Sequence, residues 1–559
     1  MSRAAPAPSP TGSGALRLLG IAVVVVLFGV LVATPLVSLA RGALDQGWSA
    51  MAAVLRGADV TTALRHTVLL AVIATLVSVT LGTALALAFD RAMLRASLGW
   101  RLALLVPVLV PQFAVTLSWA QAYGPGGLSD QLLGVTLPGL YGPFGIGLLL
   151  TVDSVPLTWL IVTAALAVRH EPDLARAARA GGAGPWTTLR TIDLPLLGGA
   201  LTAAAAVVFV STVNSFAVPQ VLGSAEGYQT LATLVYQQLT LSIGPEAFGQ
   251  LSTTALLMVA LVLVALGGAD RGLGRVGREQ ARYGASGTSP SNTGHHSSPL
   301  VVCGVAAYVV LTSALPLLAL VLTSLTRAAG LAPVPGNWSA GNYQAALTGQ
   351  AGVALTRSLV LAVAAGLLVT AMASLVVGVG GRSRRRLGTA VALGFAVPGS
   401  AMAVGTLIAY GTWLGGSAII ILMAYLAKSW ALGHRVMSAG VDRLAPELTR
   451  AGRASGASPI VVLRTITAPL MATALATSAG VVMLFALHEL TMSTILYGPD
   501  TATFAVVVLN QQQLGEIGGS AAMAVVLTLP PLVLIGVGAL LLRRRQHWLD
   551  VAGTAMRLR

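Results

Sequence analysis

The sequence predicts an all-α membrane protein whose transmembrane helices form two parallel repeats. Of 559 residues, 55% are hydrophobic and 9% are charged, and the mean hydropathy is +0.83. Apolar stretches of roughly twenty residues, the length that crosses a bilayer, recur along the chain. One polar segment occurs twice between them. A soluble chain of this composition could not cover so much apolar surface, so a polytopic membrane protein is expected.

The repeated polar segment spans residues 171–197 and 445–471. The two copies align without a gap at an offset of 274 (466 − 192, from Ile466 and Ile192), and more than half of their positions are identical. The positions that recur in the second copy include Pro172, Leu174, Arg176, Arg179, Gly182, Pro185, Leu189, Arg190, Ile192 and Pro195. This repeat indicates an internally duplicated chain.

The formal net charge of +15 is concentrated in short connectors between apolar segments. The basic connectors are 91–101, 169–190, 271–282, 382–386 and 543–545. That placement is typical of the positive-inside rule and not of a nucleic-acid-binding surface. It predicts that both polar copies and both termini are cytoplasmic.

Twelve spans are expected, six in each repeat. The predicted organisation is a disordered tail (1–14), a first repeat (15–270), a flexible cytoplasmic linker (271–299), a second repeat (300–545) and a cytoplasmic tail (546–559). The spans are expected near 15–39, 67–89, 102–122, 144–168, 199–221, 252–268, 300–325, 359–379, 387–410, 417–434, 473–490 and 521–542. An even number of spans in each half makes the halves parallel.

A nucleotide site is not expected in this chain. A phosphate-binding loop needs a lysine after a Gly-rich turn. Lys428 is the only lysine; Ala427 precedes it, and it lies inside a predicted span. No acid/base cluster, metal-binding pattern or cofactor motif stands out, and a membrane enzyme is therefore disfavoured. Any ATP must be hydrolysed by another polypeptide.

The repeated segment resembles the cytoplasmic loop of permeases from binding-protein-dependent ABC importers. The family pattern is Glu-Ala-Ala, three residues, Gly, nine residues and Ile-x-Leu-Pro. The matching residues are Ala177, Ala178, Gly182, Ile192, Leu194 and Pro195 in the first copy, and Ala451, Gly456, Ile466 and Pro469 in the second. The departures are Arg176 and Arg450 at the glutamate position, Gly452 at the second alanine, and Ala468 at the leucine. A basic loop lying on anionic lipid would not explain why the Gly, Ile and Pro recur.

The resemblance implies a type I importer permease in the bacterial inner membrane. Two copies of an ABC ATPase and an extracytoplasmic solute-binding protein would be its partners. The matching residues of both copies, together with Arg176 and Arg450, would contact the ATPase. Each loop is expected to form a short helix (174–180 or 448–454), a Gly turn, and a second segment stopped by Pro195 or Pro469.

Polar residues inside spans are candidates for the substrate pathway, because burying them in a membrane is unfavourable. Asp153 and Lys428 lie at nearly the same depth in equivalent spans, since 428 − 274 = 154. They could face a central cavity, as an ion pair or as solute contacts, or they could be purely structural. Similar candidates are Glu489, His488 and Asn214, and Asn214 occupies the position equivalent to His488.

Ferric iron is the first candidate for the cargo. Residues 214–223, 231–236, 390–409, 488–497 and 503–509 resemble ferric-iron permeases, although thiamine, phosphonate and polyamine permeases share much of this sequence. The rival class is an ion-coupled secondary carrier with two six-span halves. Asp90-Arg91 begins that class's loop motif Gly-x-x-x-Asp-Arg-x-Gly-Arg-Arg, but Ala86, Met93 and Leu94 do not fit it.

Overall fold

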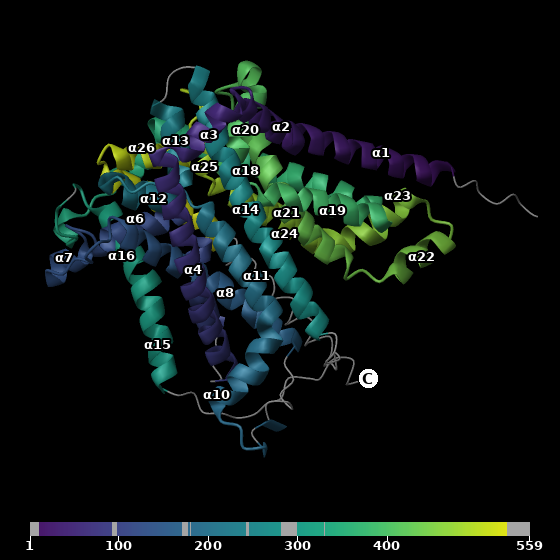
Figure 1. Ribbon diagram of the computed structural model, residues 1–559, viewed down its shortest axis with the longest axis horizontal. Coiled ribbons are helices and arrows are strands. Elements are labelled where there is room, and N and C mark those ends of the chain that lie inside the picture. Colours follow the sequence, from purple (N-terminus) through teal and green to yellow (C-terminus); the bar gives the residue numbers. More distant parts are fainter. Residues whose placement is uncertain are drawn as a thin grey trace, which may run out of the picture. The chain divides into compact units, whose positions relative to one another are not determined.

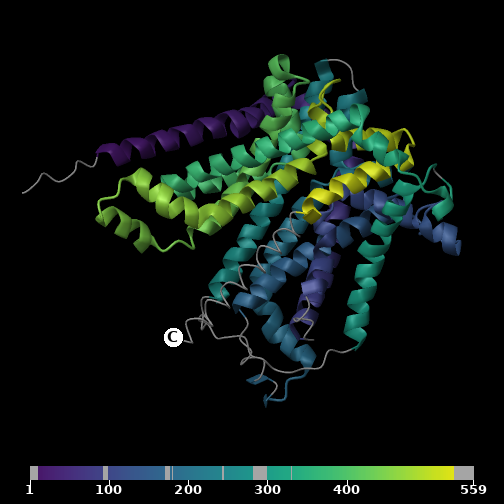
Figure 2. The same cartoon turned by 180° about the vertical axis from the view of Figure 1, so that it is seen from behind.

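The computed structural model describes residues 11–91, 98–169, 177–178, 180–241, 245–280, 299–328 and 330–533. Over these residues the regular structure is helical, apart from two isolated bridges, Thr326 with Trp338 and Gly416 with Tyr497. The chain divides into two compact units, each built from several segments (Figures 1 and 2). Unit 1 comprises Met1–Ala52, Gln238–Val259 and Val353–Val507, and unit 2 comprises Ala53–Gln237, Ala260–Gly352 and Val508–Arg559.

The helices of unit 1 come from the start of the chain and from its second half. They are α1 (Thr11–Phe28), η1 (Gly29–Ala33), α2 (Thr34–Leu44), α19 (Gly381–Ala396), α20 (Gly399–Leu414), α21 (Ala418–Val441), α22 (Pro446–Ala454), α23 (Pro459–Val462), η7 (Leu463–Thr467), α24 (Ala468–Leu487) and α25 (Thr491–Leu496). Most of α18 (Gly349–Val379) also belongs to this unit.

The helices of unit 2 come from the first half and from the start of the second. They are α4 (Ala58–Arg91), α5 (Leu98–Leu109), α6 (Gln112–Tyr123), α7 (Leu128–Leu133), α8 (Pro143–Arg169), α10 (Pro185–Thr188), η3 (Leu189–Asp193), α11 (Leu194–Val213), α12 (Ala217–Gly223), η4 (Ser224–Glu226), α15 (Pro299–Val309), η5 (Val310–Ala314), α16 (Leu315–Leu325), η6 (Pro335–Asn337) and α17 (Gly341–Leu347). Helices α3 (Gly47–Arg56), α13 (Leu231–Leu241), α14 (Pro245–Gln280) and α26 (Phe504–Gln513) contain residues of both units.

Within the described residues, eight helices are long and apolar enough to cross a membrane, and up to ten if each of two bent pairs is one span. The eight are Arg17–Leu44, Ala58–Phe89, Pro143–Ala167, Trp186–Val213, Ala247–Arg271, Val302–Leu325, Gly349–Val379 and Ile460–Leu487. A shorter apolar helix covers Ile517–Val533, and α21, with 24 residues, occupies the predicted tenth span. The predicted all-α, multi-span class is therefore confirmed.

Several predicted boundaries lie wholly or partly outside the described residues. Of the tail 1–14, the structure describes the last four residues, which begin α1. Of the linker 271–299, residues 271–280 belong to α14, and 281–298 are not described. The tail 546–559 is likewise outside. The repeat limits 15–270 and 300–545 stay a prediction.

The first spans of the two sequence halves are exchanged between the units. The first span of the N-terminal half belongs to unit 1, which otherwise comes mainly from the C-terminal half, and the first span of the C-terminal half belongs to unit 2. In unit 1, α2 packs on α20, and the Tyr410 hydroxyl donates to the Val30 carbonyl at 2.7 Å. In unit 2, α16 packs on α6, and the Trp119 indole donates to the Thr312 carbonyl at 3.2 Å. The compact units consequently differ from the two sequence repeats.

Among the described helices, four spans contain a π-helical turn that accommodates a proline. The turns η1, η3, η5 and η7 precede Pro35, Pro195, Pro316 and Pro469, each by one intervening residue. In each turn the first carbonyl accepts a hydrogen bond from the N–H five residues later. Proline lacks an N–H and collides with the carbonyl four residues earlier, so the wider π turn lets the helix continue. The prediction that Pro195 and Pro469 stop their segments is wrong, because those helices run on to Val213 and Leu487.

Two other prolines do break their spans. The third and ninth predicted spans, near 102–122 and 387–410, are each two helices, bent by 101° at Pro111 and by 99° at Pro398. Each proline is the N-cap of the second helix, with φ of −53° and ψ of 133° or 141°. The residue before a proline avoids the helical region, and Val397 has an extended ψ of 128°. These two predicted spans are therefore corrected to bent pairs.

Small residues allow the helices to pack closely, as is common within membranes. In unit 2, a Cβ placed on Gly82 of α4 would lie 2.6 Å from the Thr158 Cβ and 2.9 Å from the Val155 carbonyl of α8. Gly82 thus sets the separation of α4 and α8, the two helices that carry the core of unit 2.

We expect Gly82→Val to destabilise unit 2 by about 1–3 kcal/mol, because the added methyl groups overpack the α4–α8 contact. Thermal unfolding of the purified protein in detergent measures this as a lowered Tm. The control is Gly304→Val on α15, where a Cβ would meet nothing within 4 Å. Equal Tm values for the two variants would contradict the assigned role of Gly82.

Candidate coupling loops and intramembrane polar clusters

The second copy of the repeated segment forms a short helix closed by a glycine. Helix α22 begins after Ala445, with Pro446 in its first turn, and ends at Ala454. Beyond it, Gly456 has φ of +82°, a conformation that favours glycine. The Gly456 N–H donates to the Arg453 carbonyl at 3.0 Å, and the Ala457 N–H donates to the Gly452 carbonyl at 3.2 Å. These two bonds make a Schellman motif, which terminates the helix.

The first copy has the same backbone at the offset of 274. Ala177 and Ala178 are helical, Gly182 has φ of +87°, and the Ala183 N–H donates to the Ala178 carbonyl at 2.9 Å. The following π turns, η3 and η7, and the spans α11 and α24 keep the same offset. Arg176 lies outside the described residues, so the first short helix can be compared only in part.

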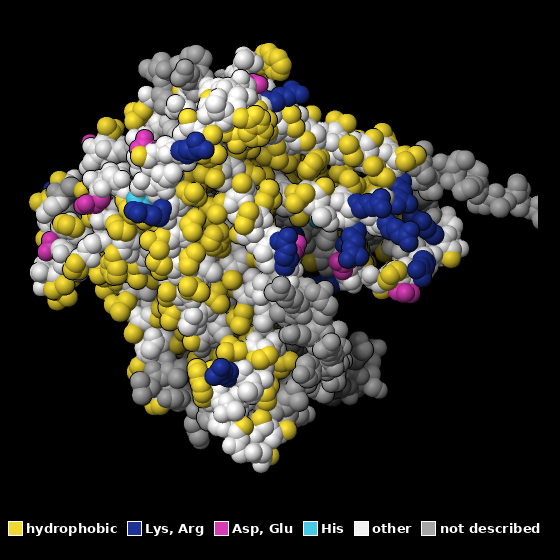
Figure 3. Space-filling view, viewed as in Figure 1, with side chains coloured by type: hydrophobic (Ala, Val, Ile, Leu, Met, Phe, Trp, Pro, Cys, Tyr) yellow, Lys and Arg dark blue, Asp and Glu magenta, His cyan; other side chains and the backbone are white. Residues whose placement is uncertain are grey.

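Both copies expose apolar side chains together with basic ones. Ile460 is 75% exposed and Trp186 of the first copy is 70% exposed, while Leu448, Val461 and Leu463 are also exposed. Arg450 and Ala451 lie on the exposed part of α22, and Ile466 packs beneath it, near Gly452. In Figure 3 the dark blue side chains of unit 1 gather where α19, α22 and α23 lie. Such an exposed apolar and basic surface is suited to a protein partner.

The remaining predicted loop residues lead from the Gly turn into the spans. Ile192 lies in η3, and Leu194 and Pro195 begin α11. Pro469 occupies the equivalent place in α24. Trp186–Val213 and Ile460–Leu487 each form one continuous helix of 28 residues. A displacement of either loop would therefore enter a membrane-spanning helix directly.

A polar cluster surrounds the Pro111 break in unit 2. Gln112, the residue after the proline, donates from Nε2 to Oδ2 of Asp153 on α8 at 3.0 Å. Ser215, next to α12, donates from Oγ to Oε1 of Gln112 at 3.1 Å. Asn214 is adjacent, at the end of α11, and its Oδ1 is buried without a hydrogen bond. Asp153 is therefore tied to the break through Gln112.

The equivalent cluster in unit 1 surrounds the Pro398 break and uses an ammonium group. Lys428 on α21 is 6% exposed; it donates from Nζ to the Phe395 carbonyl at 3.0 Å and also to the Val397 carbonyl. These carbonyls stand at the C-terminal end of α19, where the break leaves them without helical partners. A cation there is also favoured by the helix dipole. Lys428 thus satisfies the broken backbone.

Glu489 completes this second cluster, in the position of Ser215 at the offset of 274. Its Oε1 accepts from the Met492 N–H at 2.9 Å, in the first turn of α25, and the carboxylate interacts electrostatically with Lys428. Tyr425, one turn before Lys428 on α21, shares a 2.6 Å hydrogen bond with Ser493. His488 ends α24 as Asn214 ends α11.

Sequence reasoning located the charged members of these clusters but missed Gln112, Ser215, Tyr425 and Ser493. Gln112 had a signal, because it directly follows a proline inside an apolar run. Ser215 could have been found as the equivalent of Glu489. Asp153 and Lys428 have their hydrogen-bond partners within their own units, and their predicted mutual ion pair stays a prediction.

Comparison with known proteins agrees with this architecture. The family model described as "Binding-protein-dependent transport system inner membrane component" matches residues 101–271 and 362–548. An ABC transporter permease from Sinorhizobium fredii is 27% identical over 414 residues, covering 69% of this chain and 71% of the relative. An Fe(3+)-transport system permease from Haemophilus influenzae is 22% identical over 522 residues, covering 90% of this chain and 95% of the relative. A protein named as a 2-aminoethylphosphonate transport system permease from Salmonella typhi is 26% identical over 231 residues, covering 40% of this chain and 86% of the relative.

The fold and the two matched regions define a membrane permease with an internal repeat. The chain belongs to the family of inner-membrane components of binding-protein-dependent transport systems. It is thus the multi-pass inner-membrane permease of an ABC transporter, a transport subunit and not a catalytic one. Membership implies an ATPase and a solute-binding protein as partners and excludes the secondary carrier and the membrane enzyme.

We expect Lys428→Met to destabilise unit 1 by about 1.5–3 kcal/mol, because two carbonyls at the break lose a charged hydrogen-bond donor. Lys428→Arg keeps a cation and should recover most of the loss. The Tm of both variants in detergent gives the measurement. A methionine variant as stable as the wild type would show that the ammonium does not hold the break.

Proposed function

We propose that loops 171–197 and 445–471 dock into two copies of one ABC ATPase subunit on the cytoplasmic side, where both termini also lie. The observation that supports this most strongly is the repeated backbone: the same left-handed glycine, the same bond from Ala183 or Ala457, and the same π turn. Two equal shapes on one chain fit two equal clefts. The basic connectors support a cytoplasmic location.

The loops would convert ATPase motion into rearrangement of the membrane helices. Each Gly turn is followed by a helix that continues into the bilayer, to Val213 or Leu487. When the two ATPase copies close, each loop moves with its cleft and displaces the attached span. The permease would thereby alternate between states open to either side.

Ferric iron is the cargo we propose. Its support is the Haemophilus relative, which is named as an Fe(3+) permease and aligns over nine-tenths of this chain. Hard cations prefer oxygen ligands. The carboxylates of Asp153 and Glu489 and the unpaired Asn214 Oδ1 are oxygen donors within the membrane region. We propose that these oxygen donors, and His488 beside Glu489, line the part of the pathway that each unit contributes. Lys428, the remaining pathway candidate, would keep a structural role at the Pro398 break, because its ammonium is bound to two backbone carbonyls.

A phosphonate is the second candidate. The Salmonella relative named for 2-aminoethylphosphonate has a slightly higher identity than the Haemophilus protein, although over fewer residues. Lys428 would attract such an anion, whereas it would repel Fe(III). Its ammonium is already bound to two backbone carbonyls, which weakens the case for a phosphonate cargo relative to iron.

Deletion of the gene separates these cargoes. We expect a deletion strain to lose uptake of radiolabelled Fe(III) under iron limitation, because the pathway itself is missing. The same strain should grow normally with 2-aminoethylphosphonate as sole phosphorus source, and the intact gene on a plasmid should restore iron uptake. Normal iron uptake together with failed growth on the phosphonate would overturn the iron assignment and favour the second candidate.

Substitution of the turn glycines tests the docking loops. We expect Gly182→Pro and Gly456→Pro each to reduce co-purification of the ATPase at least tenfold and to abolish transport. Proline fixes φ near −65° and removes the N–H of the Schellman motif.

The control is Gly515→Pro, which disrupts the same motif at the end of α26. Gly515 has φ of +82°, and its N–H donates to Gln512 while Glu516 donates to Gln511. Undiminished ATPase binding by the Gly182 and Gly456 variants would refute the proposed docking.

A further inference from the structure

Helices α19 and α21 of unit 1 are antiparallel and are held together at three successive levels. At one end, Arg384 of α19 contacts the end of α21. In the middle, a Cβ on the buried Gly388 would collide with Nε2 of His434. At the far end, Lys428 of α21 binds the carbonyls that precede the Pro398 break. Helices α19 and α21 are therefore in contact along the length of α19.

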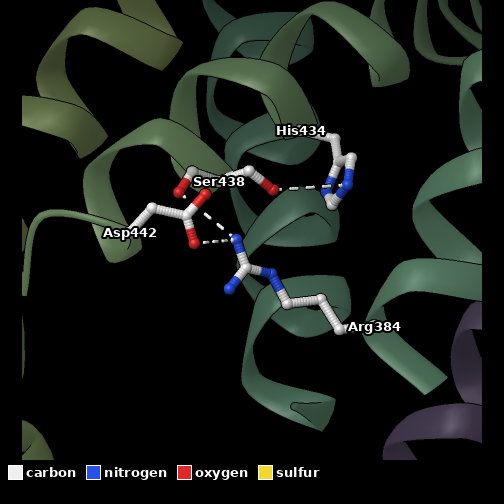
Figure 4. Close-up of polar contacts among 4 residues, drawn as sticks. All are labelled: Arg384, His434, Ser438 and Asp442. Carbon is white, nitrogen blue, oxygen red and sulfur yellow. Dashed lines mark hydrogen bonds and ion pairs between the residues drawn. The ribbon is translucent and has the colours of Figure 1, made fainter. Parts of the chain in front are cut away.

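Arg384 contacts the last turn of α21 and its C-cap (Figure 4). Its Nη2 donates to Oδ1 of Asp442 at 2.9 Å and to the Ser438 carbonyl at 3.3 Å. Asp442 is the C-cap of α21, where a carboxylate is disfavoured by the negative end of the helix dipole. Arg384 neutralises this charge and also binds a terminal carbonyl. Ser438 Oγ further contacts Nε2 of His434 at 3.4 Å.

Only a short connector separates this contact from α22. Asp442 directly follows α21, and α22 begins at Pro446. The side chain of Asp442 is 65% exposed and that of Arg384 is 23% exposed, so the ion pair contributes little to stability. Its effect is on position: it connects the segment that leads into α22 to α19, the first helix of the bent span.

We propose that Arg384 is a positioning residue that makes α19 and α21 move as one body, so that a displacement of α22 reaches the break at Pro398. This proposal rests on the proposed docking of α22 to the ATPase. Without Arg384, the last turn of α21 could follow α22 while the first turn of α19 stayed in place. The close approach of Gly388 to His434 and the bonds of Lys428 would then hold the pair only farther from α22.

Hydrogen exchange of the assembled complex tests the proposal without knowledge of the cargo. The permease–ATPase complex in nanodiscs is compared without nucleotide and with ATP plus vanadate. In the wild type we expect residues 446–454 to be protected by the ATPase, and residues 381–396 to change exchange between the two states. In Arg384→Ala, protection of 446–454 should persist, and the change in 381–396 should fall at least fivefold.

Matched variants separate position from charge. Arg386→Ala removes an equal charge from an exposed site on the same helix and should behave as the wild type. Asp442→Asn should lower the response of residues 381–396 as Arg384→Ala does, with a smaller change to the side chain. The exchanged pair Arg384→Asp with Asp442→Arg should restore the response, because each charge then suits its helix end.

The outcomes are distinguishable. A full response of residues 381–396 in Arg384→Ala and in Asp442→Asn would overturn the role of Arg384. Failure of the exchanged pair to restore the response, while Arg386→Ala responds normally, would also count against it. Absence of protection at 446–454 in the wild-type complex would instead refute the proposed docking of α22, and this proposal with it.

Discussion

The structure depends on one constraint: inside a bilayer, every backbone N–H and C=O needs a partner, because water is absent. Proline removes an N–H, and this chain places prolines within its apolar segments. At four prolines where the helix continues, Pro35, Pro195, Pro316 and Pro469, a π turn accommodates the missing N–H. Where it breaks, at Pro111 and Pro398, polar side chains from a neighbouring helix are gathered at the break. The buried polar residues of the spans are thus explained in part by the prolines beside them.

The two breaks have the same backbone and different chemistry. In unit 2 an amide links a carboxylate to a hydroxyl, and Asp153 does not touch the broken backbone itself. In unit 1 the ammonium of Lys428 binds the carbonyls directly, and Glu489 belongs to the same cluster. The two bent spans are therefore duplicated in shape, but the side chains gathered at them differ: in unit 1 they bind the broken backbone, and in unit 2 they bind one another.

The sequence predicted the class, the repeat and its offset of 274, because identical loop residues in register leave little freedom of alignment. The left-handed Gly182 and Gly456 follow from the same pattern. The breaks could not be predicted. Pro195 stands where the polar segment meets an apolar run and Pro111 stands inside an apolar run, and only the packing around each decides whether the helix continues or bends. The partners of Asp153 and Lys428 were missed for the same reason: depth can be read from an offset, but the direction of a side chain depends on the neighbouring helix.

The π turns η3 and η7 stand at a mechanically significant place. Each lies between a Schellman turn, which fixes the shape of the loop, and an unbroken helix within the membrane. π turns are rare within α-helices and are frequent at functional sites. Because each turn belongs to the continuous helix that follows its loop, motion of the loop would pass through the turn into the membrane helix. The proline that requires the turn therefore also fixes where it stands on this path.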